Sequence, residues 1–506
     1  MKKALFIKNS ITALALEITV FILGFFVPKY IIQMYGSEIH GLSASILQII
    51  SVIQLIQAGA IGASIFALFK PIEDNDTYTV SKLYHASSRF YNHTSLIYLV
   101  ISFLIAIISP FIIKIESISK NELIFSFSLF VLVGFIQFYY ISKYDTLLSS
   151  HQKRYILTIG NMIEKIAYYS LLFLVLYLNL YFIFMYVSML LGIVMKTIFL
   201  NKIVTKSFSH IIKSQPIKND TTKIPNRNNV MITSILLNIV NALPFVLLSI
   251  VWGLEYVSIY SIYAMVSGIM IMLFNVIAYS SAEILGSQVI KLNKNDIYDM
   301  FDKYNFLYFL VACLIIVPSY FLITPFVNLY VGSSSVVNYS YPLLGYSIIA
   351  NIIFYMFFLI LRSIMHSFGL FKDQKNAIII AFTISLPVFI LTAIYKFDMM
   401  VISSITFYLI YILSIYIILY MNKFNYTRLL TKPLIYFIIP IMIMILGGKL
   451  FSNHFLKIVD MYEWIKYGFL IVFVMLFLTI VYTLMFDKNK IKYLLMLIFK
   501  NKIRIL

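Results

Sequence analysis

The sequence predicts an all-α integral membrane protein with about fourteen transmembrane helices. Three observations support this prediction. The chain has 61% hydrophobic and only 12% charged residues, its apolar residues form long runs, and its lysines and arginines gather in alternate gaps between those runs. A helix needs roughly 20 apolar residues to cross the hydrocarbon core of a bilayer. Most of the runs supply that length.

The apolar runs define the expected helices in chain order. They are 10–27, 42–69, 94–113, 123–142, 155–178, 180–200, 230–251, 256–282, 304–330, 336–361, 377–395, 399–421, 429–448 and 467–486. The first run follows several lysines, as in a signal peptide, but no small-residue cleavage site follows it, so we expect an uncleaved helix. The run 429–448 is the weakest, because Pro433 and Pro440 interrupt it.

The basic residues predict the orientation in the membrane. Of the 39 lysines and arginines, seven fall on the side opposite the N-terminus and one, Lys165, falls in the middle of a run. The other 31 are assigned to the side of the termini and the even-numbered gaps, including Lys196 and Lys432 near the ends of their runs. Because basic residues accumulate in cytoplasmic loops, we expect both termini in the cytoplasm. This bias also explains the net charge of +19. A nucleic-acid partner is not expected, because the charge is scattered along the chain.

Two halves of the chain resemble each other. Tyr35-Gly36-Ser37-Glu38 precedes one apolar run, and Trp252-Gly253-Leu254-Glu255 precedes another 217 positions later. At a similar offset, 151–154 faces 372–375. Such matches predict a parallel repeat of six helices, with the halves related by an axis along the membrane normal. The alternative is that aromatic-glycine turns recur by chance at membrane surfaces.

The repeat and the basic gaps divide the chain into five expected parts. These are an N-terminal six-helix lobe (1–205), a basic cytoplasmic loop (206–228), a C-terminal six-helix lobe (229–423), two appended helices (424–486) and a basic amphipathic cytoplasmic tail (487–506). The tail is typical of a short interfacial helix that lies against anionic lipids, although the cytoplasmic bias alone would also produce it.

Few ionisable residues fall inside the apolar runs. Each such group costs about 2.5 to 3.5 kcal/mol, so it is retained only for a cavity, a partner or a function. The candidates are Glu17, Glu164, Lys165 and Glu283, with Asn161 one turn before the adjacent pair. Neighbours on a helix point about 100° apart, so we do not expect Glu164 and Lys165 to pair. Lys165 suits a lipid diphosphate; the alternative is a structural bridge to Glu17 or Glu283.

Two asparagines share one face of the run 230–251. Asn238 and Asn241 lie three residues apart, and Pro244 follows them. A proline permits a kink in a transmembrane helix, which suits a helix that bends during transport. The alternative is that the asparagines hydrogen-bond to neighbouring helices.

Three arginines lie at the expected cytoplasmic ends of helices: Arg89, Arg154 and Arg362. The cytoplasmic bias explains them without any further role. Alternatively, they form a cationic vestibule that binds a diphosphate headgroup before it enters the protein.

No enzyme signature is present. The sequence has no P-loop, no metal-binding histidine pair and no nucleophile elbow. Its single cysteine, Cys313, excludes an internal disulfide and a cysteine-based metal site. A membrane glycan polymerase would need a large outer loop, whereas the largest outer gap runs only from Lys449 to Lys466. We therefore predict a transporter without a cofactor, and leave coupling to Na⁺ or H⁺ open.

Three stretches near the N-terminus resemble a known family. Residues 35–42 (YGSEIHGL), 57–64 (QAGAIGAS) and 68–76 (LFKPIEDND) are similar to the first third of Wzx-type polysaccharide-export proteins. These belong to the MATE-like multidrug/oligosaccharidyl-lipid/polysaccharide exporter (MOP) superfamily. The resemblance implies two lobes around a central cavity, which we expect Lys165 to line.

The resemblance also implies a function. It implies a flippase that moves an undecaprenyl-diphosphate-linked oligosaccharide repeat unit across the bacterial cytoplasmic membrane by alternating access, for O-antigen or other surface polysaccharide. The implied partners are this lipid-linked glycan, membrane lipids and other polysaccharide-assembly membrane proteins. The alternatives are a lipid II flippase, a cation-coupled multidrug exporter of the same fold and, less favoured, a membrane glycan polymerase.

Overall fold

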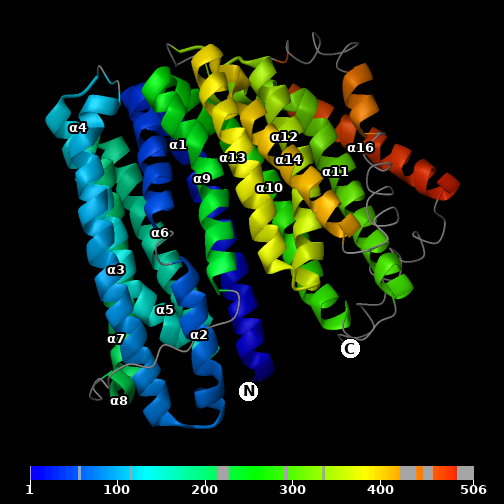
Figure 1. Ribbon diagram of the computed structural model, residues 1–506. Helices are drawn as coiled ribbons and strands as arrows, with labels where there is room; N and C mark the ends of the chain where they lie inside the picture. Colours follow the sequence, from blue (N-terminus) through cyan, green and yellow to red (C-terminus); the bar gives the residue numbers. More distant parts are fainter. Residues whose placement is uncertain are drawn as a thin grey trace. The chain divides into compact units, whose positions relative to one another are not determined.

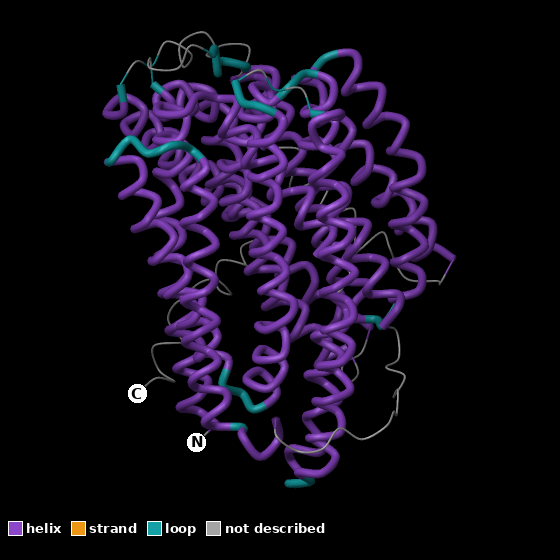
Figure 2. Tube along the Cα trace, turned by 90° about the vertical axis from the view of Figure 1, so that its left-hand side faces the viewer, coloured by secondary structure: helices purple, strands orange, loops and turns teal. Residues whose placement is uncertain are grey.

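Nearly all of the described chain is helical. The computed structural model describes residues 2–54, 58–113, 115, 117–212, 227–289, 294–332, 337–421, 440–447, 458 and 460–486. Figure 2 shows helices joined by short loops, and no strand occurs in these ranges. The all-α membrane fold predicted from the apolar runs is confirmed.

The helices follow one another closely along the chain. They are α1 (Lys2–Gln54), α2 (Ala58–Glu73), α3 (Thr77–Ile112), α4 (Lys120–Ile136), the π-helix η1 (Gln137–Ile141), α5 (Ser142–Ser150), α6 (Arg154–Tyr177), α7 (Ile183–Ser207), α8 (Ser209–Ile212), α9 (Arg227–Val251), α10 (Leu254–Val289), α11 (Lys294–Val331), α12 (Pro342–Ser367), α13 (Phe371–Tyr395), the 3₁₀-helix η2 (Phe397–Met399), α14 (Met400–Met421) and α16 (Met461–Phe486).

Twelve of the helical stretches are long and apolar enough to cross a membrane, counted over the described residues. Two differences explain why twelve stretches are found where fourteen membrane helices are expected. The first stretch, Ile11–Gln54, covers both the run 10–27 and the start of the run 42–69, which ends on α2. Most of the run 429–448 lies outside the described residues. The protein is thus a multi-pass membrane protein.

The chain forms two compact units, Met1–Ser261 and Ile262–Leu506. In the first unit α6 packs along α7 and α1, and α4 packs against α3 and α7 (Figure 1). In the second unit α14 packs against α12 and α13, and α11 packs against α12 and α16. The predicted division into lobes at 205 and 229 stays a prediction, as does the rotation that relates them.

Both occurrences of the repeated motif turn the backbone at a glycine. Gly36 breaks the helical geometry inside α1 with a φ of 85°. Gly253, with a φ of 91°, separates α9 from α10. Positive φ favours glycine, because a Cβ would clash with the backbone in that region. The two similar sequences therefore share a local helix-glycine-helix geometry.

The residues after Gly36 pack against the start of α10 within the first unit. A Cβ on Gly41 would lie 1.8 Å from the carbonyl oxygen of Leu254, so a larger residue does not fit. Next to it, His40 Nδ1 and Ser258 Oγ share a hydrogen bond of 2.7 Å, and both side chains are buried. The part of α1 that follows Gly36 and the start of α10 are consequently in direct backbone contact.

Candidate functional site

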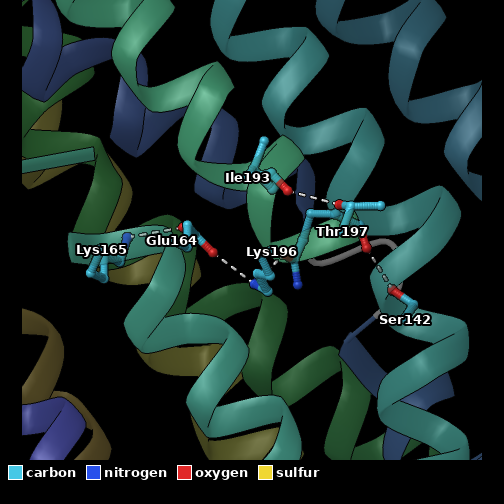
Figure 3. Close-up of polar contacts among 7 residues, drawn as sticks. Ser142, Glu164, Lys165, Ile193, Lys196 and Thr197 are labelled. Atoms are coloured by element: carbon cyan, nitrogen blue, oxygen red, sulfur yellow. Dashed lines mark hydrogen bonds and ion pairs between the residues drawn. The ribbon is translucent and has the colours of Figure 1, made fainter. Parts of the chain in front are cut away.

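A charged cluster lies between α6 and α7 in the first unit. Each carboxylate oxygen of Glu164 faces a different lysine: Oε2 lies 2.8 Å from Lys196 Nζ, and Oε1 lies 3.2 Å from Lys165 Nζ. Figure 3 shows Glu164 between the two ammonium groups. Glu164 is the eleventh of 24 residues of α6, and Lys196 is the fourteenth of 25 residues of α7. The cluster therefore lies near the middle of both helices.

Close packing of the two helices brings these charges together. Gly192 lies one turn before Lys196 on α7, and a Cβ there would lie 2.8 Å from the backbone oxygen of Glu164. The missing side chain lets the backbones approach, as small residues do where membrane helices pack. Further along, Gly160 faces the side chain of Leu200 on α7. These two glycines make the 2.8 Å ion pair geometrically possible.

A third element contributes through a π-turn. The helical stretch Lys120–Ser150 contains the π-helix Gln137–Ile141 between α4 and α5. A π-turn inserts an extra residue into an α-helix and is frequent at functional sites. At its first residue, Gln137 Oε1 accepts a hydrogen bond of 3.1 Å from Lys196 Nζ. Lys196 thereby connects α7 to both α6 and the π-turn.

The three charged side chains differ in exposure. Lys196 is 4% exposed, Glu164 13% and Lys165 34%. One carboxylate faces two ammonium groups directly, the negative charge of Asp145 also acts on Lys196, and the more accessible cation is Lys165. Such a site can hold an anion against Lys165 while Glu164 keeps a second partner.

The pairing of Glu164 with Lys165 corrects the expectation that these neighbours would not meet. The 100° between them fixes only the directions of the Cα–Cβ bonds. Long, flexible lysine and glutamate side chains bend around the helix, and their charged ends reach 3.2 Å. Lys165 thus pairs with Glu164 rather than with Glu17, which is exposed on α1 and forms no ion pair with any described residue.

Lys196 is a member of the cluster that the sequence does not single out. It lies near the end of the run 180–200, where the predicted topology groups it with the cytoplasmic lysines and leaves Lys165 as the one cation expected in the middle of a run. That expectation is wrong, because α7 continues to Ser207 and Lys196 lies well inside it. The apolar residues Ile203 and Val204 beyond Lys202 were the available signal.

The other predicted polar residues take no part in the two ion pairs of Glu164. Asn161 lies one turn before Glu164 on the same helix and is partly buried. On α9, which packs mainly against α1 and α2, Asn238 donates a 2.8 Å hydrogen bond to Ser234 O, whereas Asn241 is exposed. Glu283 belongs to α10, but its side chain lies outside the described part. Their roles remain predictions.

The three arginines proposed for a vestibule fall in two units. Arg89 on α3 and Arg154 at the start of α6 are exposed in the first unit. Arg362 on α12 belongs to the second unit, is partly buried, and lies 6.0 Å from the ring centroid of Phe358. The vestibule itself stays a prediction.

Each unit also contains a mainly apolar cavity. In the first unit a cavity of about 420 Å³ lies between α1, α3, α4 and α9, with Ser109 and Ser249 as its polar lining. In the second unit a cavity of about 630 Å³ lies between α11, α12 and residues 441–445, with Tyr320 stacked on Tyr346 at a centroid distance of 4.7 Å. Hydrocarbon chains are the chemically matched occupants of such cavities.

Solved structures resemble this chain in fold, whereas its sequence matches no protein-family model and no curated protein. An inward-facing multidrug resistance MATE family transporter of the MOP superfamily aligns with a TM-score of 0.64 at 10% identity, over 79% of this chain and 94% of that one. An outward-facing multidrug resistance MATE family transporter of the MOP superfamily aligns with a TM-score of 0.52 at 10% identity, over 88% of this chain and 96% of that one.

A MOP superfamily transporter from Pyrococcus furiosus also aligns. The TM-score is 0.53 at 11% identity, over 87% of this chain and 95% of that one. For that protein, reversed polarity of the binding pocket suggests a different function. At such low identity the likeness concerns the fold alone. The chain therefore has the fold of MATE-type transporters of the MOP superfamily.

Proposed function

We propose that this protein is a flippase for an undecaprenyl-diphosphate-linked oligosaccharide repeat unit in the bacterial cytoplasmic membrane. The observation that supports it is the accessible ammonium group of Lys165, which lies near the middle of a membrane helix and shares Glu164 with Lys196. A diphosphate leaving water needs its charge compensated. An ammonium group one-third exposed in a MOP fold supplies that compensation.

The proposal assigns roles to the candidate residues. Lys165 contacts the phosphate oxygens, and Glu164 holds Lys165 when no substrate is bound. Glu17, Asn161, Asn238, Asn241 and Glu283 are further candidates for substrate binding or for coupling to Na⁺ or H⁺. Arg89, Arg154 and Arg362 attract the headgroup on the cytoplasmic side, with both termini in the cytoplasm.

A cation-coupled multidrug exporter is the second candidate. One structural neighbour is a multidrug resistance MATE family transporter, and Glu164 supplies a carboxylate inside a membrane helix. However, both oxygens of Glu164 already face lysines, so this carboxylate already has cationic partners that a cationic drug would have to displace. A lipid II flippase shares the diphosphate chemistry and uses the same lysine.

Deletion of the gene in its own organism separates these candidates. The flippase proposal expects loss of surface polysaccharide, restored by a plasmid copy, with unchanged sensitivity to a panel of cationic drugs. An exporter instead expects increased drug sensitivity and normal polysaccharide. A lipid II flippase expects defects in cell-wall synthesis and lysis, with accumulation of the peptidoglycan precursor. Normal polysaccharide in the deletion strain refutes the leading proposal.

A further inference from the structure

The two lysines of the cluster differ in their number of hydrogen-bonding partners and in their exposure. Lys196 Nζ has two partners, Glu164 Oε2 at 2.8 Å and Gln137 Oε1 at 3.1 Å, and its side chain is 4% exposed. Lys165 has Glu164 Oε1, at 3.2 Å, as its one ion-pair partner within the described ranges, and it is 34% exposed. Lys196 is therefore the fixed cation, and Lys165 is the accessible one.

Of the two lysines, only Lys165 can leave Glu164 without leaving this buried carboxylate unpaired. A carboxylate buried in a membrane protein is strongly destabilised when it loses its last partner. If Lys165 moves away, Glu164 still has Lys196 at 2.8 Å on its other oxygen. If Lys196 moved away instead, a nearly buried ammonium group would lose both of its partners.

We infer that Lys196 is a positioning residue that lets Lys165 exchange between Glu164 and a phosphate oxygen of the substrate. This inference rests on the proposed function, because it takes the substrate to be a phosphate-linked lipid. Without substrate, Lys165 pairs with Glu164. With substrate, the ammonium of Lys165 turns to the phosphate, and Lys196 remains the ion-pair partner of Glu164. No covalent bond changes in this exchange.

Calorimetric titration of the purified full-length protein tests the inference. The probe is geranyl diphosphate, a soluble isoprenoid diphosphate, and geraniol is its neutral match. The wild type should bind the diphosphate much more tightly than geraniol. Lys165→Gln should weaken binding of the diphosphate about 10- to 100-fold, the loss of one charged hydrogen bond. Lys202→Gln removes the same charge from an exposed position of α7 and should change the affinity less than about twofold.

Variants of Lys196 distinguish a residue that positions Lys165 from one that only stabilises the fold. In Lys196→Gln, Lys165 is the remaining ammonium partner of Glu164, so it stays bound there and the affinity should fall about tenfold. In the double variant Glu164→Gln/Lys196→Gln the competing carboxylate is gone, so the affinity should return to within about threefold of the wild type. A purely structural Lys196 would change the melting temperature and leave the affinity of the folded protein unchanged.

The outcomes separate this inference from the proposed function. An unchanged affinity in folded Lys196→Gln, or a double variant that does not bind the diphosphate, overturns the exchange. If Lys196→Gln does not fold, the double variant decides alone. If the wild type binds geraniol as tightly as geranyl diphosphate, it is the proposed function that fails.

Discussion

Lys165 and Lys196 carry the same charge, and their surroundings give them different properties. Lys196 is enclosed by Glu164 and Gln137, whereas a third of the Lys165 side chain stays accessible. Burial raises the cost of removing a partner, and exposure lets a ligand compete for the ammonium group. At the scale of the residue, the two lysines should therefore respond differently to substitution.

Substitution of Lys165 should abolish export without removing the protein. We expect Lys165→Ala to lose surface polysaccharide in a complemented deletion strain, while its amount in the membrane stays near normal on immunoblots. Lys165→Arg should retain part of the export, because it keeps the charge but changes its shape and hydration. Polysaccharide at the wild-type level in the alanine variant would show that this lysine has only a structural role.

His151, in the turn between α5 and α6, should make stability depend on pH. Burial lowers the pKa of His151 below its usual 6.5, and the charges of Lys153 and His210 act in the same direction, against the hydrogen bond to Leu147 O. The folded protein therefore favours neutral His151, and this contribution is present above about pH 6.5 and is lost as the pH falls below it.

We expect the melting temperature of the wild type in detergent to decrease from about pH 7.5 to about pH 5.5. In His151→Gln the decrease should be smaller, because the neutral amide does not titrate. The other histidines are common to both proteins and cancel in the comparison. Identical pH profiles would contradict the assignment.

At the scale of the helix, glycines decide where the chain turns and how closely it packs. Gly36 divides α1 into two helical parts, and Gly253 separates α9 from α10. Gly41 and Gly192 instead lie in helical stretches, where each faces a backbone carbonyl of another helix. A methyl group at the first pair would strain the backbone, and at the second pair it would push two helices apart.

Gly41→Ala should destabilise the first unit, because its Cβ would lie 1.8 Å from Leu254 O and the helices must separate. We expect a loss of about 1 to 3 kcal/mol, typical of overpacking, seen as a lower melting temperature. Gly268→Ala is the matched control, since that glycine also lies in a helix and has open space around its Cβ position. It should be neutral or slightly stabilising. Equal melting temperatures for the two variants would contradict the contact.

At the scale of the whole molecule, the distribution of basic residues predicts the topology. Reporter fusions after Asn219 and after Asn489, positions that lie outside the described residues, should both report the cytoplasm. The reason is that 31 of the 39 lysines and arginines were assigned to that side. Lys196 lies inside α7 rather than in a cytoplasmic loop, and this one reassignment leaves the bias in place. An external signal at either fusion would overturn the count of fourteen membrane passages.

The class of the molecule follows from its amino-acid sequence. Runs of about 20 apolar residues are sufficient to specify membrane helices, since each helix satisfies its own backbone hydrogen bonds in lipid. The sequence also located Glu164 and Lys165 as charges inside a helix, and it identified the two motif glycines, because these properties are local. The sequence did not predict that Lys196 lies well inside a helix. The predicted run ends at residue 200, whereas α7 continues to Ser207, and the ends of a helix are less clearly marked in a sequence than its apolar middle.

The side-chain contacts of the cluster depend on how the helices pack. Residues 137, 164 and 196 lie on three different segments, and the spacing of charges along one segment says nothing of how neighbouring segments pack. The approach of α6 to α7 at Gly192 and the π-turn at Gln137 bring these residues together. Their contact depends on the packing of helices, in which small residues allow close approach and buried charges require partners.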